Sequence, residues 1–255
     1  KLHRSRRDDA EIRANYLDEL AASPLAAAIS EGNVPWQYAD ARLISDDPAK
    51  GLARDKELPA IADSLLEALG KPEKDVFIVS PYFVPSKWGM AALRDLTANN
   101  VKVTVLTNSL RATDVAAVHS GYARYRKDLL NAGVELYEVK PDFAPDKGLT
   151  GSSATSLHAK TFVVDGKRVF IGSLNFDPRS ARLNTEMGMV IDHAEIAGDM
   201  RQELEKITPQ YAYKVVMDKQ RKRLPDVLLK NEPDAGIWKR IISNIFSILP
   251  IEKLL

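Results

Sequence analysis

Apolar residues along the middle of the chain follow two alternating spacings. Short apolar runs that predict buried strands lie at 75–80, 101–107, 134–139, 161–165, 168–171 and 185–192. Between these runs, apolar residues recur every three or four positions, which predicts helices over 55–70, 86–99, 113–132 and 193–206. A weaker alternation over 38–45 favours one more strand. This order predicts an α/β fold with a largely parallel sheet and helices on its faces.

Cap and turn residues set the expected ends of several elements. Ser86 is expected to cap the helix that follows it, and Thr113 or Asp114 the next one. Asp165 and Gly166 are a strong hairpin signal, because Asp-Gly suits the positive φ angles of a tight turn. We therefore expect the two strands beside this dipeptide to pair.

Composition narrows the class of protein. The chain has 255 residues, 45% of them hydrophobic, so it is long enough to bury a core. Its 36 basic and 35 acidic residues leave a net charge of +1, which argues against a nucleic-acid partner. No run of about 18 apolar residues predicts a membrane span.

Metal and disulfide chemistry is also disfavoured. There are no cysteines, which excludes disulfides and cysteine-based zinc sites. The histidines are His3, His119, His158 and His193, and no pair has the spacing of a metal motif. We therefore expect no catalytic metal and no cofactor.

The most specific pattern lies between residues 158 and 175. It reads His158-x-Lys160-x4-Asp165-x6-Gly172-Ser173-x-Asn175. His158 and Lys160 are two apart beside a predicted strand, so they point to the same face. The returning strand brings Asn175 towards them. An imidazole, an ammonium and an amide can hold and attack a phosphate diester without a metal. The alternative, a strand histidine beside a solvated lysine, leaves the spacing unexplained.

This spacing resembles the HKD signature of the phospholipase D superfamily. The resemblance implies an α-β-α sandwich with a mixed, largely parallel sheet. It also implies a histidine that attacks phosphorus, giving a phosphohistidine that an alcohol or water resolves. The family's site contains two such motifs, and this chain holds one. The second is expected upstream in a longer chain or in a homodimer. In two-motif relatives the upstream histidine is usually the nucleophile, which would make His158 the general acid of the first step.

The likeness is closer to bacterial cardiolipin synthases, from about residue 38 to the C-terminus. It is carried by segments 81–85, 101–110, 117–122 and 172–180, and residues 238–255 are similar to the C-type of these enzymes. The family moves a phosphatidyl group onto phosphatidylglycerol. The resemblance therefore implies phospholipid partners, phosphatidylethanolamine as the C-type donor, and a peripheral position on the bacterial inner membrane.

The resemblance also assigns roles within the motif. Lys160 and Asn175 are expected to hold the non-bridging phosphate oxygens. Glu186 matches the family's downstream acidic residue and is expected to orient His158, because a nucleophilic histidine needs an acceptor at its other nitrogen. A surface glutamate on a strand is the alternative for Glu186.

Five further residues have both a functional and a structural interpretation. Gly172 allows close backbone approach or ends a strand, and Ser173 binds substrate or shapes the turn. Asp165 belongs to the motif, but the Asp-Gly turn favours a structural role. His119 is a candidate for binding the headgroup or the acceptor hydroxyl, and Tyr82 for lining the pocket, since it follows a strand end where α/β sheets bind ligands. A helix-surface histidine is the alternative for His119.

Three regions are expected. Residues 1–37 are interpreted as a connector from a missing N-terminal half, 38–207 as the catalytic domain and 208–255 as a tail. The chain begins with Lys1, as a piece of a longer protein or a trimmed chain would. In the tail, one helical side is apolar, formed by Trp238, Ile241, Ile242, Ile245, Phe246 and Leu249. This side suits a membrane interface, and packing on the domain suits it equally.

The basic cluster at 219–223 has two interpretations of the same kind: contact with anionic headgroups, or a solvated face. Three functional classes follow from the sequence. They are a phosphatidyl transferase, a phosphodiesterase or nuclease acting as a homodimer, and a lipid-binding module without catalysis. Near-neutral charge and the apolar tail weigh against the nuclease.

Overall fold

The structure is a computed structural model that describes residues 23–34, 36–52, 61–140, 157–217, 232, 235–238, 240–241 and 243. It divides the chain into two compact units, Lys1–Tyr38 and Ala39–Leu255. In the first unit, helix α2 (Pro24–Ser30) is capped by Ser23, whose hydroxyl accepts from the Ala26 N–H at 3.0 Å. All other described elements belong to the second unit.

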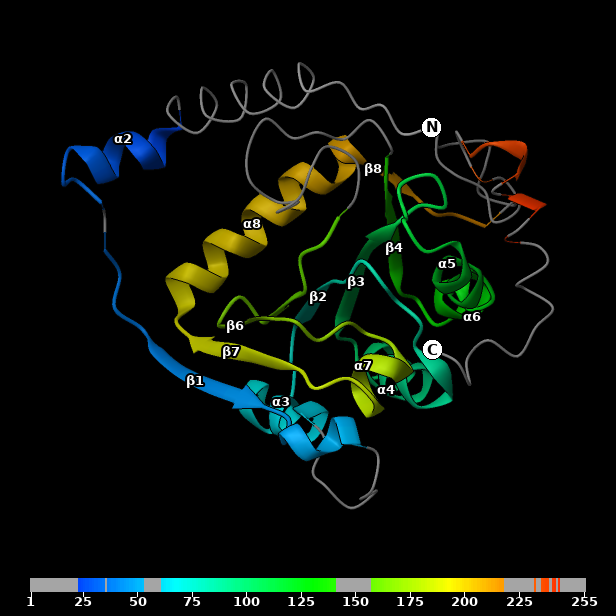
Figure 1. Ribbon diagram of the computed structural model, residues 1–255, viewed down its shortest axis with the longest axis horizontal. Helices are drawn as coiled ribbons and strands as arrows, with labels where there is room; N and C mark the ends of the chain where they lie inside the picture. Colours follow the sequence, from blue (N-terminus) through cyan, green and yellow to red (C-terminus); the bar gives the residue numbers. More distant parts are fainter. Residues whose placement is uncertain are drawn as a thin grey trace. The chain divides into compact units, whose positions relative to one another are not determined.

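The second unit is built on a mixed sheet (Figure 1). The strands are β1 (Asp40–Ser45), β2 (Asp75–Val79), β3 (Lys102–Asn108), β4 (Glu135–Val139), β5 (Thr161–Val164), β6 (Arg168–Gly172), β7 (Met187–Asp192) and β8 (Ala212–Lys214). Their order among the described residues is β1-β7-β6-β5-β2-β3-β4-β8.

The directions of the strands correct one part of the sequence prediction. The α/β class and the mixed sheet are confirmed, but parallel pairing is confined to β2-β3-β4. The pairs β1–β7, β2–β5, β4–β8, β5–β6 and β6–β7 are antiparallel. The β5–β6 link shows the reason, because a tight turn can join only antiparallel neighbours. In that turn Asp165 and Gly166 have φ angles of 54° and 58°, as the Asp-Gly signal predicts.

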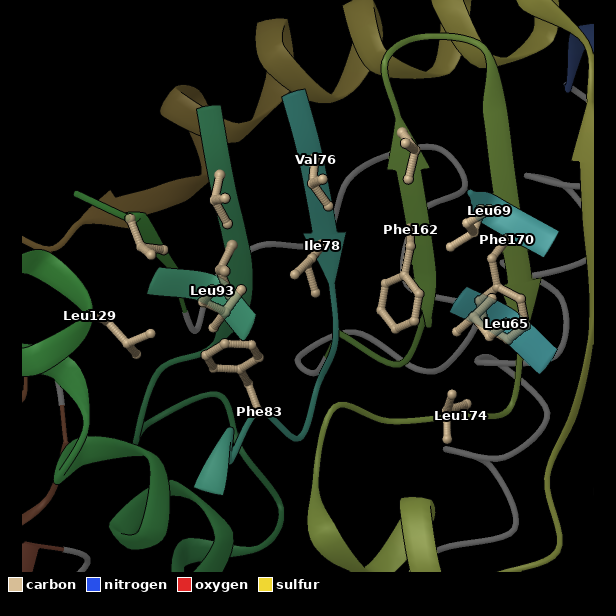
Figure 2. Packing of buried hydrophobic residues seen from close by; sticks show 14 of the residues in the cluster. Leu65, Leu69, Val76, Ile78, Phe83, Leu93, Leu129, Phe162, Phe170 and Leu174 are labelled. Carbon is tan, nitrogen blue, oxygen red and sulfur yellow. The ribbon is translucent and has the colours of Figure 1, made fainter. Parts of the chain in front are cut away.

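Helices cover both faces of the sheet. They are η1 (Pro48–Leu52), α3 (Ile61–Leu69), α4 (Ser86–Ala98), α5 (Ala116–Ala123), α6 (Arg126–Asn131), α7 (Pro178–Arg182) and α8 (Ala194–Tyr211). Side chains of β2 alternate between two cores. Val76 and Ile78 pack with apolar residues of α3 to α6 (Figure 2), whereas Phe77 and Val79 pack with residues of α8, gold in Figure 1. An α-β-α sandwich results.

One expected helix is divided in two, and the caps expected for two helices are wrong. The helix expected over 113–132 is divided into α5 and α6, because the Tyr125 N–H bonds Tyr122 O at 2.8 Å, a tight bond that ends α5. Neither Thr113 nor Asp114 is its cap, since Val115 holds that position. Ser86 has φ 54° and does not cap α4, whose N-cap is Pro85.

The helix expected over 193–206 is longer than expected, because α8 continues through Pro209 to Tyr211. His193 caps it by accepting from the Ile196 N–H at 3.3 Å. None of the described helices combines the length and apolar character needed to cross a bilayer. Leu58, residues 219–223 and the tail residues Ile242, Ile245, Phe246 and Leu249 lie outside the described residues.

Candidate active site

The residues of the motif gather at one edge of the sheet because of the strand directions. β2, β3 and β4 end at this edge, and antiparallel pairing places Thr161, the start of β5, opposite Val79. β6 ends there with Gly172, which lies opposite Gly188 near the start of β7. The carboxyl edge of parallel strands is where α/β sheets bind ligands. We use the name anion site for the residues His158, Lys160, Ser173, Asn175 and Glu186.

Lys160 places a poorly solvated cation in the anion site. It is only 8% exposed, and its Nζ donates to the His158 carbonyl at 2.6 Å. Burial lowers the pKa of Lys160, while the carboxylates of Glu186, Asp114 and Asp177 act in the opposite direction. An ammonium that has left water and has one close partner retains donors for an anionic ligand.

His158 has a fixed backbone and a free ring. Its neighbour Leu157 is held on both sides by Asn108, which donates to Leu157 O and accepts from the Leu157 N–H, each at 3.1 Å. The His158 side chain is exposed, and its ring has no hydrogen-bond partner among the described residues. Asn108 thereby fixes the backbone immediately before His158, and no sequence motif marks it for this role.

Asn175 carries an unsatisfied polar atom. Its Nδ2 donates to Ser180 Oγ at 3.4 Å, and its Oδ1 is buried with no partner among the described residues. Buried amides are nearly always satisfied, so an open atom indicates a place for a ligand. Rotating the amide by half a turn lets the Ser180 hydroxyl donate to the oxygen and leaves the NH₂ group for a phosphate oxygen.

Glu186 lies in the anion site but contacts a different partner from the one expected. Its carboxylate accepts from the Ser173 hydroxyl and from Asn184 Nδ2, the latter at 3.2 Å. No hydrogen bond joins it to His158 in the described part of the chain. Ser173 also accepts from the Met187 N–H at 3.1 Å, so its hydroxyl links Glu186 to β7.

Asp46 holds Glu186 in place from the end of β1. Its Oδ2 accepts from the Glu186 N–H at 2.9 Å, and its own N–H donates to Glu186 O at 2.8 Å. The same carboxylate pairs with Lys50 at 2.7 Å and accepts from the Ile61 N–H at 2.8 Å. Asp46 is 3% exposed, and the sequence indicated only that it ends a strand.

Tyr82 lies at the same edge, paired with Asp114. Its hydroxyl donates to the Asp114 carboxylate at 2.9 and 3.0 Å. Burial, with Asp114 beside it, raises the pKa of Tyr82 to about 12. The phenol therefore remains protonated and a donor at any working pH. Asp114, expected as a helix cap, instead belongs to the surroundings of Lys160.

Asp165 is at the opposite end of β5 and organises backbone. Its carboxylate accepts from the N–H groups of Glu73, Lys74 and Asp75 at 2.7 to 3.1 Å. Burial raises its pKa, but these three donors outweigh burial and lower it overall. These bonds attach the β5–β6 hairpin to the start of β2. Asp165 thus has the structural role that the Asp-Gly turn favoured.

Gly172 is needed for packing rather than for substrate approach. A Cβ on Gly172 would lie 2.5 Å from Met187 O and 2.6 Å from the Phe170 ring. Its partner Gly188 would place a Cβ 2.2 Å from the same ring. Phe170 is fully buried between these two glycines. The substrate-binding interpretation of Gly172 therefore finds no support in its surroundings.

His119 lies away from the anion site, in a second polar group. Its Nδ1 is 3.3 Å from Asn108 O, and its Nε2 is 3.0 Å from Arg126 Nη2 and 3.2 Å from Glu232 Oε2. At 3% exposure it is neither the surface histidine nor the open headgroup ligand that the sequence suggested. We use the name buried ion cluster for His119, Arg126, Glu138 and Glu232.

Arg126 is the centre of the buried ion cluster. It bonds Glu138 through Nε and Nη2 at 2.8 and 2.9 Å, and Glu232 through Nη1 at 2.6 Å. The hydroxyl of Tyr122 donates to Glu138 at 2.8 Å. Ligand atoms of His119, Glu138 and Glu232 lie within 4.8 Å of one another, as a metal site requires. The guanidinium already supplies the cation there, so we assign the cluster to structure.

The geometry of the anion site suits a phosphate diester. A buried lysine, an amide with an unpaired oxygen and an exposed imidazole lie at one edge of the sheet, and the carboxylates of Glu186, Asp114 and Asp177 act on the lysine. Fold and site together define a phospholipase D-like domain. A family model described as "Cardiolipin synthase, PLD-like domain" matches residues 65–208. The chain belongs to this family of cardiolipin synthase domains, as its sequence predicted.

Named relatives agree with this assignment. The chain is 45% identical to cardiolipin synthase C of Escherichia coli K12, over 94% of its own length and 53% of that protein. It is 31% identical to cardiolipin synthase A of Pseudomonas aeruginosa PAO1, over 68% of its length and 32% of that protein. The chain thus spans about half, or less, of the curated relatives it matches.

Two solved structures share the fold. One is Nuc of Salmonella typhimurium, a phospholipase D family member, with TM-score 0.50 and 16% identity over 69% of this chain and 98% of that one. The other is the phosphatidylserine synthase of Haemophilus influenzae, with TM-score 0.59 and 13% identity over 84% of this chain and 46% of that one. At these identities the likeness concerns the fold.

Proposed function

We propose that the chain supplies one of the two HKD motifs of a cardiolipin synthase-type phosphatidyl transferase. The observation that carries this proposal is that His158, Lys160 and Asn175 lie at one sheet edge, where the Lys160 ammonium retains donors and the Asn175 amide has an unpaired oxygen. The 45% identity to a protein named cardiolipin synthase C supports the choice of reaction. The second motif comes from an upstream half of a longer protein or from a second copy.

The proposed reaction has two displacements. In the first, an imidazole nitrogen bonds to the donor lipid's phosphorus, the bond from phosphorus to the headgroup oxygen breaks, and that oxygen takes a proton. In the second, a hydroxyl of phosphatidylglycerol attacks phosphorus, loses its proton, and the phosphorus–nitrogen bond breaks. By resemblance, His158 donates the proton in the first step and accepts it in the second. Lys160 and Asn175 hold the non-bridging oxygens. Phosphatidylethanolamine is the proposed donor.

Glu186 is proposed to act on this chemistry through its neighbours. Its carboxylate fixes Ser173 by a hydrogen bond and raises the pKa of Lys160 against the effect of burial. Replacing Glu186 by Gln is expected to slow turnover while leaving the fold intact. Equal rates for the two proteins would remove Glu186 from the site.

A peripheral position on the bacterial inner membrane is part of the proposal. In the tail, Ile237 and Trp238 are 75% and 77% exposed, and Ile241 is 43% exposed. Ser243 is buried instead and lies 2.9 Å from Ser120 of α5, Oγ to Oγ. A helix that turns its serine inward and its apolar residues outward suits a lipid surface. Deleting 236–255 is expected to reduce sedimentation with liposomes; undiminished binding would reject this role.

The deciding experiment follows cardiolipin by mass spectrometry, with phosphatidylglycerol alone and with added phosphatidylethanolamine. The chain, a longer protein that includes an upstream half, and the His158→Ala variant of each are compared. We expect cardiolipin wherever two motifs are present, and a loss of roughly 10³-fold or more in His158→Ala. Absence of cardiolipin from both wild-type proteins, with hydrolysis of nucleic acid, would replace the proposal by the nuclease alternative.

A further inference from the structure

We propose that a cavity beside the anion site holds a fatty acyl chain of the lipid substrate; this inference rests on the proposed function. The cavity has a volume of about 780 Å³ and lies between α3, α4 and the sheet. Val76, Ile78 and Phe162 form its floor, and Leu65 of α3 and Leu93 of α4 stand on opposite sides of it. Figure 2 shows these side chains around one space.

The size of the cavity sets it apart from ordinary packing. Protein interiors are close-packed, and their voids seldom exceed a water molecule. A space of about 780 Å³ instead falls among pockets that hold small molecules, roughly 300 to 1,000 Å³. The floor and the facing side chains of Leu65 and Leu93 are hydrocarbon, so water, a sugar or a nucleotide would find no partners against them. A flexible hydrocarbon chain suits both the volume and the lining.

The mouth of the cavity is also suited to a lipid. Leu66 and Trp88 line it and are 54% and 55% exposed, so apolar surface extends from the interior to the outside. Charged residues of both signs also line it, among them Lys71, Arg182 and Glu67. Over the whole lining, the carboxylates of Asp63, Glu67, Asp95 and Asp177 outnumber the two cations, so the cavity itself does not attract a phosphate. The cavity would therefore recognise the tail of a lipid, and another part of the molecule must recognise its phosphate.

Asn175 connects the two, because it lines the cavity and also belongs to the anion site. Asn175, Phe176 and Asp177 line the cavity, and Asn175 is also the open amide of the anion site. His158 and Lys160 do not line the cavity. A ligand that reaches from one to the other must carry an anionic group at one end and hydrocarbon at the other. A phospholipid whose phosphate lies at Asn175 meets this condition.

The test measures binding without turnover, so it does not depend on whether the chain makes cardiolipin. Phosphatidylglycerols with acyl chains of graded length are titrated below their aggregation limit. Binding is followed by isothermal titration calorimetry, whose signal does not depend on the tryptophan content of the variants. With chains of roughly six to fourteen carbons, affinity is expected to rise about fourfold per CH₂ and then reach a plateau when the cavity is full.

Two substitutions on one helix provide the control. Ala92 lines the cavity, whereas Ala91 is exposed and does not. Ala92→Trp should remove most of the dependence on chain length, and Ala91→Trp should retain it. Melting curves check that both variants fold. A length dependence shared by all three proteins would overturn the cavity, and so would a wild-type protein that binds no lipid because protein fills the space.

The two proposals fail in different ways. Length-dependent binding that Ala92→Trp abolishes, without any cardiolipin from the chain or from a longer protein, would sustain the cavity and refute the transferase. Cardiolipin formation whose rate is indifferent to acyl length and to Ala92→Trp would sustain the transferase and refute the cavity.

Discussion

The anion site and the buried ion cluster are both groups of charged and polar side chains, and they differ in how completely they are satisfied. In the cluster, Arg126 donates to Glu138 and Glu232, and His119 contacts Arg126 and Glu232. In the anion site the His158 ring has no partner among the described residues, and Asn175 has an open atom. Charges that are fully paired hold the fold together, whereas polar groups without a protein partner remain available to a ligand.

Breaking the cluster should have the largest effect on stability. Arg126→Met leaves Glu138 and Glu232 buried without their cation, and we expect a loss of about 3 to 5 kcal/mol in the free energy of unfolding. Urea unfolding measures this loss. Lys127→Met, at an exposed position one residue later, should stay within about 0.5 kcal/mol. A cost below about 1 kcal/mol for Arg126→Met would show that the cluster is not structural.

A substitution in the anion site should slow the reaction strongly and change the stability of the fold little. Lys160→Met is expected to slow cardiolipin formation by about 10² to 10³ in a protein with both motifs, because a donor to the transferring phosphate is lost. Its stability should change by less than about 1 kcal/mol, since burial already disfavours this charge. Rate and melting temperature are measured together, with Lys167→Met on the exposed hairpin as control. A Lys160→Met protein that loses stability along with activity would contradict the distinction between the anion site and the buried ion cluster.

Acid should weaken the cluster in a defined range of pH. Burial raises the pKa of Glu232, but bonds to His119 and Arg126 prevail and lower it from 4.5 to about 2. A carboxylate with a depressed pKa stabilises the fold above pH 4.5, and this contribution disappears as pH falls towards 2. Wild type should exceed Glu232→Gln by about 3 kcal/mol at pH 7, and by little near pH 2.

The measurement is a series of urea unfolding curves between these pH values. Glu203→Gln, an exposed carboxylate on α8, serves as the control and should show a small difference at every pH. A gap between wild type and Glu232→Gln that does not change with pH would mean that the two differ for a reason other than ionisation.

The smallest effect is expected at the rim of the anion site. Tyr82→Phe removes one hydrogen bond to Asp114 and should cost about 1 kcal/mol, or roughly a fivefold loss of rate. The pKa of Tyr82 is raised to about 12, so the phenol does not ionise in the working range. The alkaline limb of a pH–rate profile should therefore be the same in both proteins. A shift of that limb in Tyr82→Phe would assign the titration to the phenol.

The sequence was a good guide where the signal is local. The spacing of apolar residues located β1 to β7, and Asp165-Gly166 located the hairpin, because both depend on neighbours in the chain. It missed β8, which lies in the region interpreted as a tail. The β5–β6 pairing brings the positions of His158, Lys160 and Asn175 to one sheet edge, and their shared catalytic role stays a prediction. Strand direction was predicted less well, since the pairing of β2 with β5 joins residues more than 80 positions apart.

The supporting residues could not be found in this way. Asp46 lies 140 positions from Glu186, and Asn108 lies 49 from Leu157. Neither carries a motif, because one carboxylate or amide that bonds a distant backbone leaves no periodicity. His119 was misjudged for a related reason. A histidine on a helix reads as exposed until the residues that cover it, here Arg126 and Glu232, are known.

The two hydrogen bonds between the Asn108 side chain and the Leu157 backbone have a consequence for protein engineering. Two hydrogen bonds from one side chain fix both the position and the direction of the backbone immediately before His158. Whatever the length of the chain before Leu157, His158 follows a backbone position that is fixed against Asn108 at the end of β3. We therefore expect this junction to accept insertions, or new chain termini, with little disturbance of the chemistry. In evolutionary terms, we expect the segment before Leu157 to vary in length while the position of His158 is kept.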